Sequence, residues 1–360
     1  MNSKAIIAMS GGVDSSVAAC LMKQRGFDCI GVTMKLFANE DIGIPREHSC
    51  CSLDDVEDAR SVARMLGIPY YVFNFSDRFR EDVIARFISA YENGRTPNPC
   101  IDCNRYLKFD KLYHRAKELD RDFVVTGHYA RIEQDTETGR YLLKKAVDPA
   151  KDQSYVLYSL TQEQLAHTLF PLGSMTKPDV RKIAEEQGFI NARKHDSQDI
   201  CFVQNGSYAD FIEEHTGRSY PAGNFVDRDG NILGRHRGII RYTIGQRKGL
   251  GLALPEPMYV YAVNPSDNTV MLGKESELYT RELTAKDINL ISLPNIEKPM
   301  RIKAKVRYRQ PEMWAAVTQT DADTIRVEFD EPQRAVTAGQ AVVLYDGDTV
   351  VGGGTIQISI

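Results

Sequence analysis

The chain has 360 residues, of which 42% are hydrophobic and 26% charged, and its 45 basic and 49 acidic side chains give a net charge of −4. This composition is typical of a globular protein and excludes disordered and fibrous chains. No apolar run reaches the ~18 residues that span a bilayer, and the N-terminal stretch lacks the features of a secretory signal, so we expect no membrane segment. The acidic balance excludes a basic field over the whole molecule, so any nucleic-acid site must be a local patch.

The first 130 residues or so alternate short apolar runs with amphipathic helical patterns. We expect strands over residues 5–9, 29–34, 70–75 and 123–126, and helices over 15–25, 54–66, 77–91 and 105–119. Such alternation predicts an α/β fold with a parallel sheet that is covered by helices on both faces. Ligands of these sheets bind beyond the carboxyl ends of the strands, so we expect the site there.

After about residue 200 the helical periodicity mostly disappears, and short strands punctuated by glycine and proline follow. We expect strands over residues 259–263, 269–272, 301–308, 315–319, 324–329, 341–345 and 354–360. This pattern predicts an all-β half made of one or two small barrels or sandwiches. The expected organisation is a Rossmann-like α/β domain over residues 1–205, a central β-rich domain over 206–285 and a C-terminal β-barrel over 286–360.

The segment SGGVDSS, residues 10–16, joins the first predicted strand to the first predicted helix. Gly11 and Gly12 allow the backbone to approach a ligand, and a helix N-terminus offers free N–H groups and the positive end of a dipole, which suits a pyrophosphate. The segment is neither a Walker A loop nor a G-x-G-x-x-G fingerprint. The simpler alternative is an ordinary turn in which Asp14 caps the helix.

Seven cysteines, an odd number, occur without secretory features. This pattern indicates a reducing cytoplasm, in which thiol chemistry or metal binding is more common than structural disulfides. Cys20 and Cys29 fall in apolar elements and are predicted core residues. Cys50 and Cys51 precede a predicted helix, and their role stays open.

The remaining cysteines are the C-x-x-C pair Cys100 and Cys103, and Cys201. Two prolines in residues 95–99 predict a loop around the pair, and a helix expected from Asn104 would place Cys103 near a helix N-terminus, where a thiolate is stabilised. A C-x-x-C pair alone is compatible with redox activity, zinc binding or incidental spacing, although the proline-rich approach does not suit a thioredoxin-type motif. A catalytic thiol at Cys103 that works with a distant thiol at Cys201 is the sharper hypothesis.

Two sets of motifs carry a family resemblance. SGGVDSS is similar to the PP-loop of the ATP pyrophosphatases, which cleave ATP to AMP and pyrophosphate while they adenylate a substrate. The words TPNPCIDCN, TGHYA, KDQSYVL, DSQDICF, YTIGQRKGLG and KVRYRQ follow in this order at wide separations. Together they resemble the tRNA-specific 2-thiouridylases, the MnmA family, from about residue 4 to residue 358.

This resemblance implies a set of site residues. It makes Cys103 the nucleophile and Cys201 the carrier of a persulfide, and it places Asn98, Pro99 and Cys100 against a flipped-out target base. Family members often have Asp at the position of Cys100, so the role of this third thiol stays open. The residues assigned to ATP are Ala8, Met9, Ser10, Gly11, Gly12, Val13, Asp14, Ser15, Met34 and Gly127.

The resemblance also implies contacts with tRNA. Taken alone, His128 is equally consistent with a structural hydrogen-bonding histidine, and Gln340 has no independent signal. The residues assigned to tRNA are His128, Lys151, Asp152, Gln153, Arg307, Tyr308 and Gln340.

Two basic stretches are candidates for a nucleic-acid surface. In the predicted strand over residues 301–309, the period of two places five positive side chains on one face without an interrupting acid. An anionic partner would relieve their repulsion, although a solvated edge strand is the alternative. The stretch 231–255 is rich in glycine and basic residues, and its loops could follow a phosphate chain. The basic residues are Arg301, Lys303, Lys305, Arg307 and Arg309, and Arg235, Arg237, Arg241, Arg247 and Lys248.

The leading hypothesis is thiolation of the wobble uridine of tRNA. ATP with Mg²⁺ would adenylate the C2 oxygen, and a persulfide on Cys201 would supply sulfur to C2, with Cys103 resolving the persulfide or forming a disulfide with Cys201. The expected partners are tRNAs with Lys, Glu or Gln anticodons and a persulfide donor such as a cysteine desulfurase or a sulfur-relay protein, and the protein is expected to be a monomer.

Three alternatives stay open. In the first, Cys100, Cys103 and Cys201 hold a [4Fe–4S] cluster with one open iron for sulfide. In the second, the PP-loop serves a ligase for a small molecule, which leaves the basic β half and the two special cysteines unused. In the third, the protein is a non-catalytic RNA-binding module, which release of pyrophosphate in the presence of tRNA would exclude.

Overall fold

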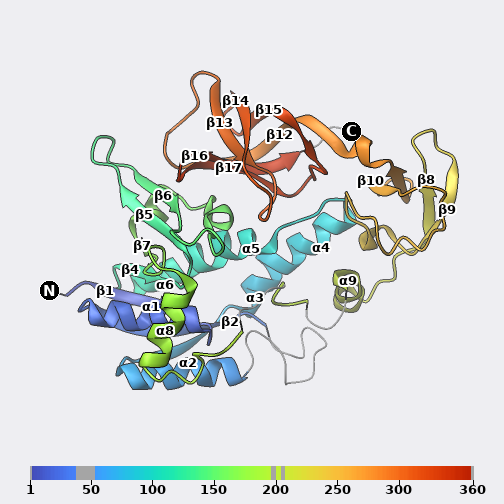
Figure 1. The fold of residues 1–360 in the computed structure, drawn as a ribbon. Coiled ribbons are helices and arrows are strands. Elements are labelled where there is room, and N and C mark those ends of the chain that lie inside the picture. Colours follow the sequence, from blue (N-terminus) through green and yellow to red (C-terminus); the bar gives the residue numbers. More distant parts are fainter. Residues whose placement is uncertain (1, 38–52, 196–199, 204–206, 358–360) are drawn as a thin grey trace.

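The computed structural model describes residues 2–37, 53–195, 200–203 and 207–357. The chain forms an α/β unit, a small β-sheet and a β-barrel, which lie at the lower left, the right and the top of Figure 1. None of the described helices is long and apolar enough to cross a membrane. Cys50 and Cys51 lie outside the described residues.

The α/β unit is built on a five-stranded sheet in the order β3-β2-β1-β4-β7, in which every neighbouring pair is parallel. The expected parallel sheet is thus confirmed. Because side chains alternate along a strand, Ala5 and Ile7 of β1 pack on one face and Ile6 on the other. The strands are β1 (Lys4–Ala8), β2 (Asp28–Lys35), β3 (Tyr70–Asn74), β4 (Phe123–Val125) and β7 (Thr168–Leu169).

Helices cover both faces of this sheet. The side chains of α1 (Val13–Gln24), α2 (Leu53–Leu66) and α8 (Lys177–Glu186) pack on the face of Ala5 and Ile7, and those of α6 (Leu112–Glu118) pack on the face of Ile6. The predicted strands 5–9, 29–34, 70–75 and 123–126 therefore lie where expected within one or two residues. The short strand β7 and the helix α8 had no counterpart in the sequence analysis.

A helical arm projects from the carboxyl ends of the strands and includes two π-helical segments. Its first half consists of α3 (Ser76–Phe79), the π-helix η2 (Arg80–Ile84) and α4 (Ala85–Glu92). Its second half consists of α5 (Pro99–Asp102) and the π-helix η3 (Cys103–Lys111), which leads into α6.

The predicted loop at residues 100–103 is wrong, because this segment is the first turn of the helix. The Asn98 side chain caps α5 by accepting a hydrogen bond from the Cys100 backbone N–H at 3.2 Å. Pro99 occupies a first-turn position, where its missing N–H has no partner to lose. Pro99 thus starts a helix here, where the two prolines were expected to impose a loop.

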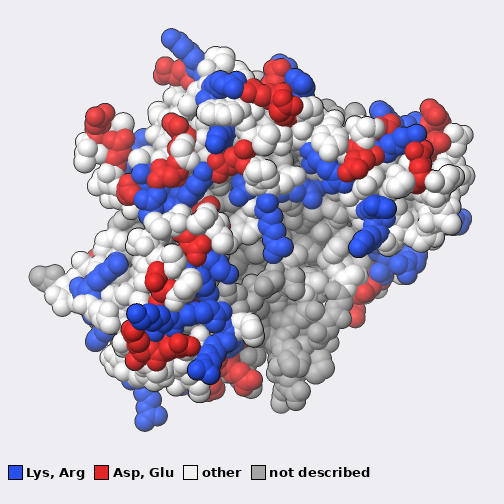
Figure 2. All heavy atoms as spheres, viewed as in Figure 1, with Lys and Arg blue, Asp and Glu red and all other residues white. Residues whose placement is uncertain are grey.

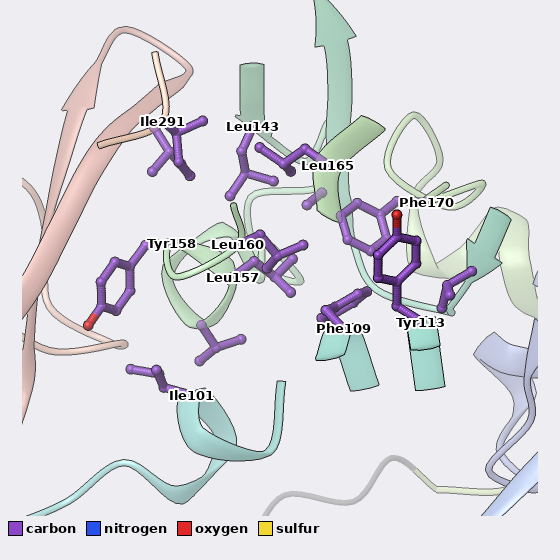
Figure 3. Close-up of a cluster of buried hydrophobic side chains, with 14 of the residues drawn as sticks. Ile101, Phe109, Tyr113, Leu143, Leu157, Tyr158, Leu160, Leu165, Phe170 and Ile291 are labelled. Atoms are coloured by element: carbon purple, nitrogen blue, oxygen red, sulfur yellow. The ribbon is translucent and has the colours of Figure 1, made fainter. Parts of the chain in front are cut away.

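A hairpin and two short helices connect the α/β unit to the barrel. They are β5 (Ala130–Gln134), β6 (Tyr141–Lys145), the 3₁₀-helix η4 (Ser154–Leu157) and α7 (Gln162–Ala166). The hairpin extends the barrel sheet, since β6 pairs with β17. Figure 3 shows Leu157, Leu160 and Ile291 in one apolar cluster with Phe109, Tyr113 and Phe170. The same cluster contains sheet residues such as Ile6 and barrel residues such as Val343, so one continuous core joins the two units.

The barrel has six antiparallel strands and is closed by pairing of its first strand with its last. This confirms the predicted C-terminal barrel, although the sequence analysis missed its long first strand. The predicted strand 301–308 ends at Lys305. The strands are β12 (Tyr279–Leu290), β13 (Met300–Lys305), β14 (Met313–Asp321), β15 (Thr324–Arg334), β16 (Ala341–Asp346) and β17 (Thr349–Gln357).

The small sheet lies between the other two units along the chain and has the order β10-β11-β8-β9. A helix, α9 (Tyr208–Thr216), precedes it in the stretch where we expected mostly strands. The strands are β8 (Gly223–Val226), β9 (Ile232–His236), β10 (Tyr259–Asn264) and β11 (Thr269–Gly273), with 3₁₀-helices η5 (Ile239–Arg241) and η6 (Glu275–Leu278).

The continuous core between the α/β unit and the barrel predicts that two leucine substitutions differ in their effect on stability. Leu157 is fully buried in it, and Leu119 at the end of α6 is 40% exposed. We expect Leu157→Ala to lower the free energy of unfolding by about 2–5 kcal/mol through lost burial and a residual cavity, and Leu119→Ala to change it by less than ~1 kcal/mol. Urea unfolding followed by circular dichroism measures both, and equal effects would contradict the joint core.

Candidate functional site

A cavity of about 370 Å³ lies at the carboxyl ends of β1, β2 and β4, where the fold class places its ligands. It collects residues from the phosphate loop, from β2, from the turn after β4, from the helical arm and from residues 200–202. Its lining consists of Ala8, Met9, Ser10, Asp14, Ser15, Val32, Thr33, Met34, Leu36, Phe79, Val83, Pro99, Cys100, Cys103, Lys108, Thr126, Gly127, His128, Gln153, Ile200, Cys201 and Phe202.

The phosphate loop has the backbone that an anion site requires. Gly11 has a φ of +75°, and Gly12 is the N-cap of α1, so that no side chain of the N-cap residue hydrogen-bonds to the backbone N–H groups of the first turn. A Cβ on Gly11 would lie 2.4 Å from the Asp55 carbonyl oxygen of α2, and one on Gly127 would lie 2.8 Å from the Ser15 nitrogen. The loop is therefore packed between two backbones, with the N-terminus of α1 at the cavity.

Asp14 does not cap the helix, so that alternative is wrong. It lies in the first turn, and its carboxylate accepts hydrogen bonds from the buried Lys177 ammonium at 2.7 and 2.8 Å and from the Tyr129 hydroxyl at 2.8 Å. The loop is held further by Asn191, whose amide donates to the Gly11 carbonyl at 2.9 Å. Lys177 and Asn191 had no signal in the sequence, because they come from a later part of the chain.

The structure brings Cys103 and Cys201 to one cavity, and no disulfide joins the two. Cys103 is buried at the start of η3, and Cys201 is half-buried and packs against the same apolar cluster. The neighbouring Phe202 fixes the segment of Cys201, because its ring lies 5.6 Å from the ring of Phe79 and 5.2 Å from that of Phe87 in the helical arm.

Burial raises the pKa of the Cys103 thiol, and the Lys108 ammonium acts in the opposite direction. The expectation that a helix N-terminus stabilises this thiolate is wrong, because the helix begins at Pro99 and Cys103 lies in its second turn. The exposed Cys100, not Cys103, lies in the first turn.

His128 is buried beside the thiols and is neutral. Its Nδ1 lies 2.7 Å from the Thr126 hydroxyl, and burial lowers its pKa well below the ordinary value. It thus has the structural hydrogen bond that the sequence analysis kept open, and it also lines the cavity. A neutral imidazole adds no charge to this end of the site.

Comparison with known proteins identifies the family. A tRNA methyl transferase HUP domain model matches residues 3–205, a tRNA methyl transferase PRC-barrel domain model matches 209–274, and an aminomethyltransferase beta-barrel domain model matches 280–356. The chain is 54% identical to the tRNA-specific 2-thiouridylase MnmA of Clostridioides difficile, over 100% of this chain and 99% of the relative. It is also 54% identical to that of Acetivibrio thermocellus, over 98% of this chain and 99% of the relative. The chain belongs to the tRNA-specific 2-thiouridylase family.

Among solved structures, a 4-thiouridine synthetase–RNA complex with bound ATP is similar over 60% of this chain and 50% of that chain. The sequence identity is 19% and the TM-score 0.38, too low to support an argument. Membership of the 2-thiouridylase family thus rests on the sequence relatives.

The three residues expected at the target base lie around the start of α5. Pro99 and Cys100 line the cavity. Asn98 caps the helix and lines a neighbouring cavity of about 630 Å³ together with Asp102, a carboxyl whose pKa burial raises to about 6. Their role in a 2-thiouridylase remains a prediction.

Of the residues expected to contact tRNA, His128 and Gln153 line the cavity, and Asp152 and Gln153 have internal hydrogen bonds. The Gln153 side-chain oxygen accepts from the Tyr129 backbone N–H at 2.9 Å, and Asp152 accepts from the Ala146 backbone N–H at 2.9 Å. Lys151 lies in the same turn between β6 and η4. These bonds fix the backbone beside the cavity.

Tyr308 and Gln340 connect the barrel to segments beside the cavity, whereas Arg307 makes its hydrogen bonds elsewhere. The Gln340 amide donates to the Thr96 and Pro97 carbonyls at 2.9 and 3.1 Å, directly before α5. The Tyr308 hydroxyl donates to the Asp152 carbonyl at 3.1 Å. The Arg307 guanidinium donates to the Ala335 carbonyl at 2.8 Å and to the Thr337 hydroxyl at 2.7 Å.

The prediction of one uninterrupted basic row over residues 301–309 is wrong. The strand ends at Lys305, and Arg307 donates hydrogen bonds to the protein itself. Arg301 pairs with Asp330 of the neighbouring barrel region at 2.6 Å and lies over the exposed ring of Trp314. Figure 2 shows that Lys and Arg instead gather, with few acidic neighbours, between the barrel at the top and the β8–β9 region at the right.

In the second basic stretch, Arg241 is also paired, because its guanidinium donates to Asp210 and Glu213 of α9 at 2.8 and 2.5 Å. This guanidinium is therefore already paired within the protein. The acids come from α9, which the sequence analysis did not predict.

The structure does not support the iron–sulfur hypothesis for Cys100, Cys103 and Cys201. Across residues 2–37, 53–195, 200–203 and 207–357, no group of three or more His, Cys, Asp or Glu side chains is arranged to hold a metal ion. The three thiols share the cavity, but their geometry is not that of a ligand set.

The burial of Cys103 predicts a difference in thiol reactivity. Because burial raises its pKa, Cys103 reaches the thiolate form at higher pH than an ordinary thiol, so iodoacetamide at neutral pH should modify the exposed Cys100 at least ~10-fold faster. Both residues lie in the tryptic peptide 96–105, so fragment ions measure the two rates side by side. The fully buried Cys20 serves as the unreactive control. Faster modification of Cys103 would contradict the assignment.

Proposed function

We propose that the protein catalyses ATP-dependent 2-thiolation of the wobble uridine in tRNA. Its family membership makes it a tRNA sulfurtransferase that uses ATP through a PP-loop. One observation carries the detailed proposal: the phosphate loop, Cys103 and Cys201 all open into one cavity. A substrate carbon in that cavity lies within reach of both an activating nucleotide and two thiols.

The loop supplies what ATP requires. The N-terminus of α1, freed by the Gly11-Gly12 turn, accepts the phosphates, and Met34 and Gly127 at the strand ends flank the adenosine. Gly127 packs closely on the start of α1, because a Cβ there would lie 2.8 Å from the Ser15 nitrogen. Mg²⁺ would neutralise the charge of the phosphates when bound. Asp14 is the carboxylate in the described lining of the cavity that could hold this ion, and it is paired with Lys177 in the structure.

The thiols supply the sulfur. The C2 oxygen of uridine attacks the α-phosphorus of ATP and displaces pyrophosphate, which turns that oxygen into part of a good leaving group, AMP. The Cys103 thiolate attacks Sγ of a Cys201 persulfide, so that a Cys103–Cys201 disulfide forms, the bond to the outer sulfur breaks, and hydrosulfide leaves with the electron pair. Hydrosulfide then attacks C2, and AMP leaves. A thiol reductant restores the two cysteines.

The finer assignments belong to the same proposal. We propose domains at 1–205, 206–285 and 286–360, tRNAs with Lys, Glu or Gln anticodons as substrates, and a cysteine desulfurase or sulfur-relay protein as donor. The target base would stack near Pro99 and Cys100, while Lys151 and the residues around it meet the anticodon arm. We further propose a monomeric protein that acts in the cytoplasm.

The cysteine roles predict a clear pattern among variants. Cys103→Ser and Cys201→Ser should each reduce 2-thiouridine formation to background, because a hydroxyl neither carries nor resolves a persulfide. Cys20→Ala, which changes a buried cysteine of α1, should retain activity within about twofold. The assay incubates unmodified tRNA with protein, ATP, Mg²⁺ and a persulfide donor, and nucleoside mass spectrometry detects replacement of oxygen by sulfur.

Binding of tRNA should survive in both serine variants. Full thiolation by either one would overturn the assignment of that cysteine. A product that gains a methyl group instead of sulfur would overturn the proposed reaction itself.

The phosphate loop predicts a contrast between two glycines. Gly11→Ala places a Cβ 2.4 Å from the Asp55 carbonyl and must displace the loop, whereas a Cβ on Gly26, which has a similar φ of +82°, has no neighbour within 4 Å. We expect Gly11→Ala to weaken ATP binding by at least ~10-fold and Gly26→Ala to leave it near the unmodified value. Titration calorimetry measures both, and equal affinities would contradict phosphate binding at this loop.

A further inference from the structure

Lys108 contributes a positive charge to the sulfur end of the cavity, which comprises Cys100, Cys103 and Cys201. It is the only Lys or Arg among the described residues that line this cavity. Asp14, the only carboxylate in that lining, is already paired with Lys177. Among the parts of the chain that the structure describes, no carboxylate forms an ion pair or hydrogen bond with Lys108.

The π-helix explains how Lys108 reaches this place. In an α-helix, residues five apart differ in direction by about 140°, since each residue turns the chain by about 100°. In a π-helix, the hydrogen bond joins residues i and i+5, which lie one turn apart. Cys103 and Lys108 are five apart within η3 (Cys103–Lys111), so the local widening of the helix puts both side chains at the same cavity.

The chemistry of the site needs such a charge. The lining of the cavity includes the apolar side chains of Phe79, Val83 and Phe202. A lone thiolate there would be costly, and a fixed ammonium has its largest effect where water is scarce. A lysine that has no carboxylate partner among the described residues is poised here for an anion on sulfur.

We propose that Lys108 is a positioning residue that stabilises the Cys103 thiolate, and afterwards the departing hydrosulfide, during sulfur transfer. This role rests on the proposed function, since it serves the attack of Cys103 on the Cys201 persulfide. Transfer of the negative charge from Cys103 to hydrosulfide keeps the anion beside the same ammonium throughout the step.

The other groups near Cys103 cannot take this role. Cys100 and Asp102 of α5 raise the pKa of Cys103, as like charges do, and Lys108 lowers it. His128, which follows β4, is neutral, and Cys201 contributes a further thiol. The remaining neighbours in the apolar cluster carry no charge.

The test is the pH dependence of Cys103 alkylation, read from peptide 96–105, in Lys108→Met, Lys108→Gln and Lys108→Arg. Loss of the charge should raise the midpoint by about one pH unit and slow the reaction roughly 10-fold at neutral pH. Lys108→Arg should restore the midpoint. Lys111→Met is the matched control, since Lys111 lies in the same π-helix and pairs with Asp110 at 3.0 Å; it should leave the midpoint unchanged.

Thermal unfolding shows which variants are folded, and the two neutral variants give two independent measurements. An unchanged midpoint in a folded neutral variant, or an equal shift in Lys111→Met, would overturn the proposal. The rate of single-turnover thiolation by persulfide-loaded protein should fall in the two neutral Lys108 variants and be retained in Lys108→Arg and Lys111→Met. The rate of tRNA-dependent pyrophosphate release should fall much less in the neutral variants. A larger fall in pyrophosphate release than in thiolation would assign Lys108 to the nucleotide instead. Because alkylation needs neither ATP nor tRNA, its outcome is independent of whether the unmodified protein thiolates tRNA.

Discussion

The packing of Phe202 against the helical arm brings Cys201 to the cavity that Cys103 also lines, and these are the two cysteines proposed to transfer sulfur. Its ring contacts Phe79 and Phe87 of the arm and Phe211 of α9 at centroid distances between 5.1 and 5.6 Å. Cys201 is covalently next to this anchor, and Cys103 lies in the same apolar cluster. Buried aromatic rings contribute strongly to stability and prefer specific relative orientations. This cluster therefore determines where Cys201 lies relative to Cys103.

Few charged side chains line the described part of this cavity. The Asp14 carboxylate is neutralised by Lys177, the His128 imidazole is neutral, and Lys108 remains as an ammonium without an acidic partner among the described residues. Such a site favours anions at both ends. The phosphate groups would meet the N-terminus of α1 at one end, and sulfur anions would meet Lys108 at the other.

The barrel contributes to this site through contacts with its wall. Gln340 holds the two carbonyls that precede α5, and Tyr308 holds the turn that carries Gln153. The joint apolar core around Leu157 keeps the barrel and the α/β unit in a fixed relation (Figure 3). Tyr308 and Gln340 therefore position the backbone beside the cavity.

The sequence by itself determined the local features: the parallel βα alternation, the phosphate loop at a strand end and the C-x-x-C pair, because each depends on residues close together in the chain. Tertiary structure alone decided that Cys201 and Cys103 line one cavity, that Lys177 and Asn191 hold the loop, and that β12 closes the barrel with β17, since these arrangements join distant segments. The helix start at Pro99 and the π-helix that turns Lys108 toward Cys103 were also beyond local pattern. Sequence periodicity predicts a regular α-helix. The cap at Asn98 and the packing around the helical arm instead favour a helix that starts at Pro99 and contains a π-helical segment.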